Sequence, residues 1–70
     1  MNKIQAEMAG TIFQVLVSEG EKVEEGQVVI VLESMKMEIP VESNVSGEIE
    51  TIHVAEGDFV NEGDVLVTLR

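Results

Sequence analysis

The sequence predicts an all-β fold, a small sandwich or flattened barrel, from three observations. The 70-residue chain repeats itself at an offset of 37 residues. Its apolar runs are rich in Val and Ile, and none keeps a helical period beyond one turn. Polar turns that contain Gly separate these runs at short, regular spacing. A duplicated structural unit, in which each half buries the apolar face of the other, accounts for all three observations.

The repeat is seen when residues 8–33 are aligned with residues 45–70. Ten of the 26 aligned positions are identical: Gly10/Gly47, Ile12/Ile49, Val17/Val54, Glu19/Glu56, Gly20/Gly57, Val23/Val60, Glu25/Glu62, Gly26/Gly63, Val28/Val65 and Leu32/Leu69. Every glycine of one half therefore has a glycine mate in the other, which indicates an internal duplication. We expect a single domain over residues 1–70, with repeat halves of about 1–33 and 39–70 and a connecting hairpin at 34–38.

Each half is expected to contain a strand, two polar turns and a second strand. These elements are 12–17, 19–21, 25–27 and 28–32 in the first half and 49–54, 56–58, 62–64 and 65–69 in the second. Gly10 and Gly47 precede the first strands, where a glycine indicates a bulge or a close approach of backbone. Pro40 lacks an N–H donor, so we expect it at a strand start or a sheet edge.

Composition excludes several classes of function. A net charge of −10, from 4 basic and 14 acidic residues, argues against nucleic acid or an anionic membrane as partner. The absence of Cys removes disulfides and thiolate metal sites, and a single His cannot form a multi-His site. We place His53 on the surface rather than in a catalytic role. So small a chain leaves no room for a substrate pocket of about 300–1,000 Å³, so an independent enzyme is not expected.

The sequence also predicts a location and an oligomeric state. The longest apolar run, Val28–Leu32, is far shorter than the roughly 20 residues that span a bilayer. The first seven residues lack the apolar core of a signal peptide. A cytoplasmic protein is therefore expected, and the acidic surface favours a monomer.

Residues 34–38 lie between the two halves and have no mate in the repeat. They join two successive strands, so they form a hairpin whose tip is exposed. The segment contains no Gly, Asn, Asp or Pro; instead Met35 and Met37 flank Lys36. A two-residue turn at Met35-Lys36 would force both residues into unfavourable backbone angles. Strain of about 1–3 kcal/mol per residue persists mainly where a function fixes the geometry.

The segment Glu33–Glu38 resembles the attachment motif of biotinyl domains, in which a ligase modifies the Lys of Met-Lys-Met. The turns at 20–27 and 57–64 also look like the paired turns of the biotinyl/lipoyl family, and the resemblance extends from about Ile4 to Leu69. It implies a flattened barrel-sandwich hybrid of two four-stranded antiparallel sheets related by a pseudo-two-fold axis, with Lys36 at a hairpin tip.

The resemblance also implies a function, that of a biotin carboxyl carrier. Biotin attached covalently to Lys36 by a biotin protein ligase would shuttle a carboxyl group between a biotin carboxylase and a carboxyltransferase. Met35 and Met37 would be recognised by the ligase. Ser34 and Glu38, which flank them, are either further recognition determinants or ordinary polar residues of a hairpin. The chain would then be a carrier protein and not itself an enzyme.

Two alternatives stay open. Glu33-Ser34 is similar to the pair that precedes the modified Lys in lipoyl domains, which implies a carrier with lipoate on Lys36 that moves acyl or aminomethyl groups. The other alternative is an unmodified acidic β module that only binds protein. Lys3 and Lys22 are poorer attachment candidates; the mate of Lys22 in the repeat is Phe59, so that position does not require an amine.

Overall fold

The computed structural model describes residues 2–70, and this part of the chain forms eight β-strands. Their bounds are β1 Asn2–Gln5, β2 Gly10–Val15, β3 Lys22–Val23, β4 Val28–Ser34, β5 Met37–Glu42, β6 Gly47–Ile52, β7 Phe59–Val60 and β8 Val65–Leu69. The all-β prediction is confirmed. Within residues 2–70 there is no helix with the length and apolar character that a membrane crossing requires.

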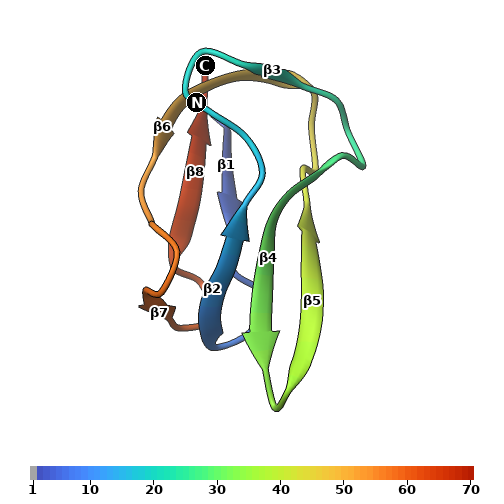
Figure 1. The fold of residues 1–70 in the computed structure, drawn as a ribbon. Helices are drawn as coiled ribbons and strands as arrows, with labels where there is room; N and C mark the ends of the chain where they lie inside the picture. Colours follow the sequence, from blue (N-terminus) through green and yellow to red (C-terminus); the bar gives the residue numbers. More distant parts are fainter. Residues whose placement is uncertain (1) are drawn as a thin grey trace.

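The strands form two four-stranded antiparallel sheets, as expected (Figure 1). One sheet has the order β1-β8-β6-β3 and the other β5-β4-β2-β7. Replacing each strand by its mate 37 residues away converts the first order into the second. The pseudo-two-fold relation predicted from the repeat is therefore present in the strand order as well as in the sequence.

The core between the sheets is aliphatic. It is centred on repeat mates with exposed fractions of 1% or less, namely Ile12 with Ile49 and Leu32 with Leu69. Alternation along the strands places such residues inside and their neighbours outside. No aromatic side chain is among the buried residues of the described chain. Val, Ile and Leu thus supply the burial that holds the two halves together.

The polar turns of each half are bound to strands of the other half. Gly20 N–H donates to the carbonyl of Ile49 at 2.8 Å, and its mate Gly57 donates to Ile12 at the same distance. Both glycines have positive φ, 89° and 95°, which explains the residue type. Since each half satisfies backbone groups of the other, the two halves depend on each other for a complete structure.

Gly10 and Gly47 are mates in the repeat and begin β2 and β6, but their surroundings differ. A Cβ on Gly10 would lie 2.8 Å from the Glu33 carbonyl oxygen, so the expected close backbone approach is confirmed there. A Cβ on Gly47 would meet nothing nearer than 3.6 Å, so there is no close approach at this residue. The register of β6 instead shifts two residues later, between Ile49 and Thr51. Pro40 lies on β5, which is an edge strand, as predicted.

The strand bounds differ from the predicted ones. The first strand of each half begins and ends two residues early, at Gly10–Val15 and Gly47–Ile52, although Val17 is still buried. The strand predicted at 28–32 continues to Ser34. The two-residue strands β3 and β7 were not predicted, because two residues are too few to show alternation. Both lie at the edges of their sheets.

Candidate functional site

The candidate site is the tip of the β4–β5 hairpin. Pairing continues through Glu33↔Glu38 and Ser34↔Met37, which leaves a loop of two residues, Met35 and Lys36. Their φ angles are 54° and 66°, and two positive φ values in a two-residue loop are typical of a type I′ turn. The predicted unfavourable backbone angles are confirmed. The five-residue link is shorter than expected, because Ser34, Met37 and Glu38 belong to strands.

The side chains at the tip are open to solvent. Met35 is 91% exposed and Met37 59%, and Lys36 and Glu38 are also exposed. Ser34 is half-buried at the end of β4. Figure 1 shows the loop projecting beyond the neighbouring strands at one end of the molecule. An amine at this position can be approached by an enzyme without displacing any other part of the fold.

The other two lysines lie in different surroundings. Lys3 is on β1 opposite Thr68, and Lys22 is on β3 opposite Glu48. Both are exposed, but their backbones belong to paired strands within the sheet. Lys36 differs from them by its place in a two-residue loop outside the strand pairing.

The base of the hairpin is packed tightly against β2. Thr11 pairs with Glu33, and Gly10 beside it is buried under the Glu33 carbonyl. The close approach at Gly10 could be predicted from sequence, but the neighbour that makes it could not. Strand β2 thus fixes the position from which β4 carries Lys36 outward.

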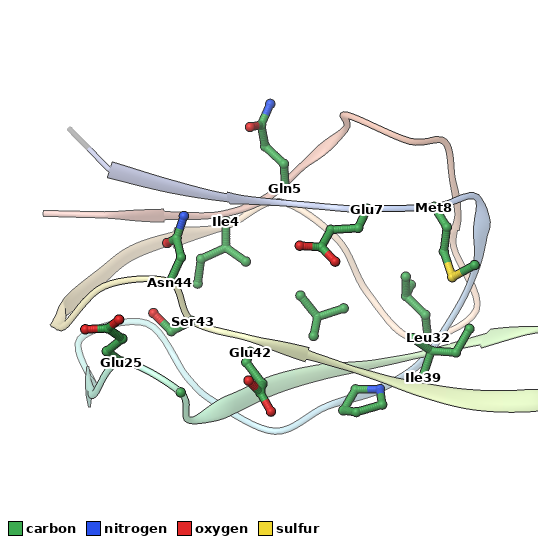
Figure 2. Close-up of a pocket in the computed structure, with 13 residues that line it drawn as sticks. Ile4, Gln5, Glu7, Met8, Glu25, Leu32, Ile39, Glu42, Ser43 and Asn44 are labelled. Atoms are coloured by element: carbon green, nitrogen blue, oxygen red, sulfur yellow. The ribbon is translucent and has the colours of Figure 1, made fainter.

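A groove of about 420 Å³ lies between β1 and the β4–β5 pair (Figure 2). It is a surface groove whose lining includes exposed glutamates, and it differs from a pocket enclosed within the core, for which the sequence predicts no room. Figure 2 shows Gln5 pointing away from the groove. Residues that line it include Ile4, Leu32, Ile39, Glu7, Glu25 and Glu42.

No His, Lys or Cys side chain is among the described residues that line the groove. Its buried hydroxyl, that of Ser43, donates to the backbone carbonyl of Val45. His53 is not among the lining residues; it is exposed, with Nε2 2.7 Å from Thr68 Oγ1. Across residues 2–70 no three His, Asp or Glu side chains are grouped so that they could hold a metal ion.

One surface feature was missed from the sequence. Phe59 is 65% exposed on β7 and pairs with Thr11, the residue of β2 that also pairs with Glu33 at the hairpin base. The signal was present in the repeat, where the mate of Phe59 is the polar residue Lys22. A hydrophobic residue whose mate is charged is not needed by the core.

Comparison with curated proteins finds relatives with biotin in their names. The chain is 50% identical over 38 residues to biotinylated protein TB7.3 of Mycobacterium bovis, over 54% of each chain. It is also 50% identical over 38 residues to the biotin/lipoyl attachment protein of Bacillus subtilis, covering 54% of this chain and 52% of that one. The chain spans about half the length of the curated relatives it matches.

A solved structure shares the whole fold. The chain superposes on part of the urea carboxylase of Kluyveromyces lactis with a TM-score of 0.92 and 30% sequence identity, over 99% of this chain and 6% of that one. A family model described as "Biotin-requiring enzyme" matches residues 1–69. With its two pseudo-symmetric sheets and the Met-Lys-Met hairpin between the repeats, the chain belongs to the biotin/lipoyl attachment family.

Proposed function

We propose that this protein is a biotin carboxyl carrier in which biotin is attached to Lys36. The observation that carries the proposal is the placement of an exposed lysine in a two-residue loop whose backbone is unfavourable for both residues. A relative that is named as biotinylated and the structural likeness to a carboxylase support biotin as the group. The proposal covers residues 1–70 as one attachment domain, with the hairpin at 34–38.

The residues of the tip suit the group chemically. A lysine amine on a flexible four-carbon stem can be acylated, which removes its charge and lengthens the arm. When bound, biotin supplies the ureido nitrogen that takes up and gives up the carboxyl group. The chain holds the arm in place, and tethering raises the local concentration of the group at each partner active site.

Three enzymes are the proposed partners. A biotin protein ligase modifies Lys36 and contacts Met35 and Met37, whose exposure makes them available to it. A biotin carboxylase and a carboxyltransferase then use the arm in turn. Ser34 and Glu38 make further contacts with the ligase in this proposal. The chain acts as a monomeric carrier, and the reactions take place on its partners.

The test is to express the chain with a biotin ligase, a lipoyl ligase and both cofactors, followed by intact mass and peptide mapping. We expect one biotin adduct, on Lys36. The Lys36→Arg variant should show no adduct while its circular dichroism and melting temperature stay close to those of the wild type, because the exposed tip contributes little to the core. An adduct that persists in this variant would show that Lys36 is the wrong residue.

Lipoate remains the second candidate, and specific observations favour it. Glu33-Ser34 matches the lipoyl-type upstream pair, and the Bacillus subtilis relative is named for both groups. A lipoyl adduct on Lys36 in the same experiment would move the function to acyl or aminomethyl transfer. A chain that stays unmodified with both ligases present would leave an acidic module that binds protein.

A further inference from the structure

Both aromatic residues of the chain lie on its surface. The sequence contains two Phe, no Trp and no Tyr. Phe13 is 42% exposed and Phe59 is 65% exposed. Aromatic side chains contribute more burial than any other type, yet the core of this small domain is built without them. Their positions are therefore not explained by the folding of the chain.

The internal repeat provides a control for this statement. The mates of Phe13 and Phe59 are Glu50 and Lys22, at equivalent places on β6 and β3. Lys22 is exposed and Glu50 half-buried. Since the same fold accepts a charged residue at both positions in one half, it does not require a phenylalanine in the other. The two halves differ here in surface chemistry and not in structure.

The two phenylalanines lie in the sheet that carries the attachment hairpin. Phe59 pairs with Thr11, Thr11 pairs with Glu33, and Glu33 pairs with Glu38. This row crosses the sheet at about 4.8 Å per strand, so the backbone of Phe59 is roughly 10 Å from the base of the hairpin. Phe13 lies two residues beyond Thr11 on β2. Figure 1 shows β7 and the hairpin loop at the same end of the molecule.

The same row is acidic where it reaches the hairpin. Glu33 and Glu38 are exposed and lie directly opposite each other across β4 and β5. Like charges at directly opposed positions destabilise a sheet, so the stability of the fold does not explain this pair either. The outer side of this sheet thus combines two exposed aromatic side chains with a carboxylate pair, on a chain of net charge −10.

We propose that this docking face, made of Phe13, Phe59, Glu33 and Glu38, binds the biotin carboxylase that loads the arm. The inference rests on the proposed carrier function and adds the surface through which that partner holds the domain. The face carries the Glu33/Glu38 carboxylate pair on a chain of net charge −10, so cationic residues on the docking surface of the partner would complement it. Exposed aromatics are the usual anchors of such contacts.

The ligase fits this face less well than the carboxylase does. It acts on the amine of Lys36 itself, so contact with the hairpin at 34–38 is enough to place its reacting atoms. The carboxylase acts at the far end of the attached arm, so it has to fix the body of the domain to fix the direction of the arm. The docking face lies behind the tip, beside the base of the hairpin, and so meets that requirement.

The test uses variants in which each residue is replaced by its own repeat mate, Phe59→Lys and Phe13→Glu. Leu16→His is the matched control, because Leu16 is 49% exposed and its mate in the repeat is His53. Leu16 lies outside the docking face, beyond the far end of β2, where its backbone N–H donates to the carbonyl of Val29. Each protein is loaded with biotin, its mass and melting temperature are checked, and it is assayed with the purified biotin carboxylase of the same organism. Affinity of the unloaded proteins for that enzyme is measured by biolayer interferometry.

We expect Phe59→Lys to raise the KM for the carrier and the dissociation constant of the unloaded protein by about tenfold or more, with kcat unchanged. Leu16→His should stay within about twofold of wild type. Equal values for Phe59→Lys and wild type, with wild type a good substrate, would overturn the docking face and leave the carrier function intact.

Other outcomes identify a different occupant and also overturn the proposal. Slower biotin loading of Phe59→Lys, with unchanged carboxylase kinetics, would assign the face to the ligase. A wild-type dimer in sedimentation analysis that Phe59→Lys dissociates would assign it to a second copy of the chain. A wild-type chain that takes no biotin, or that is no substrate once loaded, would overturn the carrier function itself and the partner with it.

Discussion

Met35 and Lys36 adopt a backbone conformation that costs most residues about 1–2 kcal/mol. At the four other positive-φ positions of residues 2–70 the chain places glycine, at Gly20, Gly26, Gly57 and Gly63. At the hairpin tip the two positive-φ positions hold residues other than glycine. Since Asn-Gly would satisfy the same turn without strain, the residues of the tip were not selected for stability. Recognition of these side chains by another protein would account for their presence.

Replacing Met35 by Asn should therefore stabilise the protein and impair its modification. Asn tolerates the left-handed region, so we expect a gain of about 0.5–1 kcal/mol, which is about 2–8 °C in melting temperature for a domain of this size. Biotin loading of Lys36 should slow, because the most exposed side chain beside the amine is lost. Thermal unfolding and single-turnover loading with a biotin ligase measure the two effects.

The matched control is Met37→Asn, at an exposed position on β5 where φ is not positive. It should bring no gain in stability, because Asn is a poor strand residue. A loss of stability in Met35→Asn, or an equal gain in both variants, would contradict the account of strain at the tip.

At the scale of elements, the contact between β2 and β4 sets the position of the β4–β5 hairpin. The Gly10→Ala variant should be destabilised by about 1–3 kcal/mol, because its methyl group would lie 2.8 Å from a backbone carbonyl that cannot move without shifting the hairpin base. Gly47→Ala is the control at the equivalent place, with no neighbour closer than 3.6 Å. Its stability should stay within about 0.5–1 kcal/mol of wild type.

Urea unfolding of both variants measures the difference. Equal destabilisation of the two would mean that the cost comes from backbone flexibility and not from the crowding at Glu33. A large loss in Gly47→Ala alone would show that the two halves are packed differently from what the distances indicate.

The longer strands and the turns could be predicted because their signals are local. Residues 28–32 and 65–69 are runs of mostly β-branched and aliphatic residues, and the glycines between strands mark the turns. Strands β3 and β7 could not be predicted, because each consists of two residues held by pairing with a distant strand. Their existence depends on the closed fold and not on their own residues.

The tip of the hairpin was predictable only through the repeat. Residues 34–38 contain no Gly, Asn, Asp or Pro, and the absence of a mate in the other half is what predicts a connection there. The two-residue length of the loop follows from pairing of Ser34 with Met37, which the sequence does not specify. The neighbourhood of Phe59 and Glu33 depends in the same way on the register of three strands.

At the scale of the whole molecule, the pseudo-two-fold axis relates the attachment hairpin to the ends of the described chain. Leu32 pairs with Ile39 beside the hairpin, and their mates Leu69 and Asn2 pair with each other at the opposite end (Figure 1). The longest dimension of the molecule is 31 Å. The two ends are equivalent in fold and differ in that one carries Lys36 and, beside it, the aromatic and acidic face.

This equivalence allows the hairpin to be moved. In a circular permutant that begins at Met37 and ends at Ser34, Arg70 would be joined to Asn2 by the five residues Ser-Met-Lys-Met-Glu. These occupy the place equivalent to residues 34–38. We expect the permutant to fold, since it keeps every strand pair. Its transplanted lysine should be loaded by the ligase, which contacts only the five residues of the hairpin in the proposed scheme.

The loaded permutant should nonetheless be a poor substrate of the biotin carboxylase, with a KM raised about tenfold as in Phe59→Lys. In its new sheet the places of Phe13, Phe59 and Glu33 are held by Glu50, Lys22 and Arg70. Adding Glu50→Phe, Lys22→Phe and Arg70→Glu should restore the KM toward the wild-type value. An unsubstituted permutant with the same KM as wild type would mean that the carboxylase recognises only the hairpin and the arm. A permutant that folds but takes no biotin would show that the ligase also recognises the body of the domain.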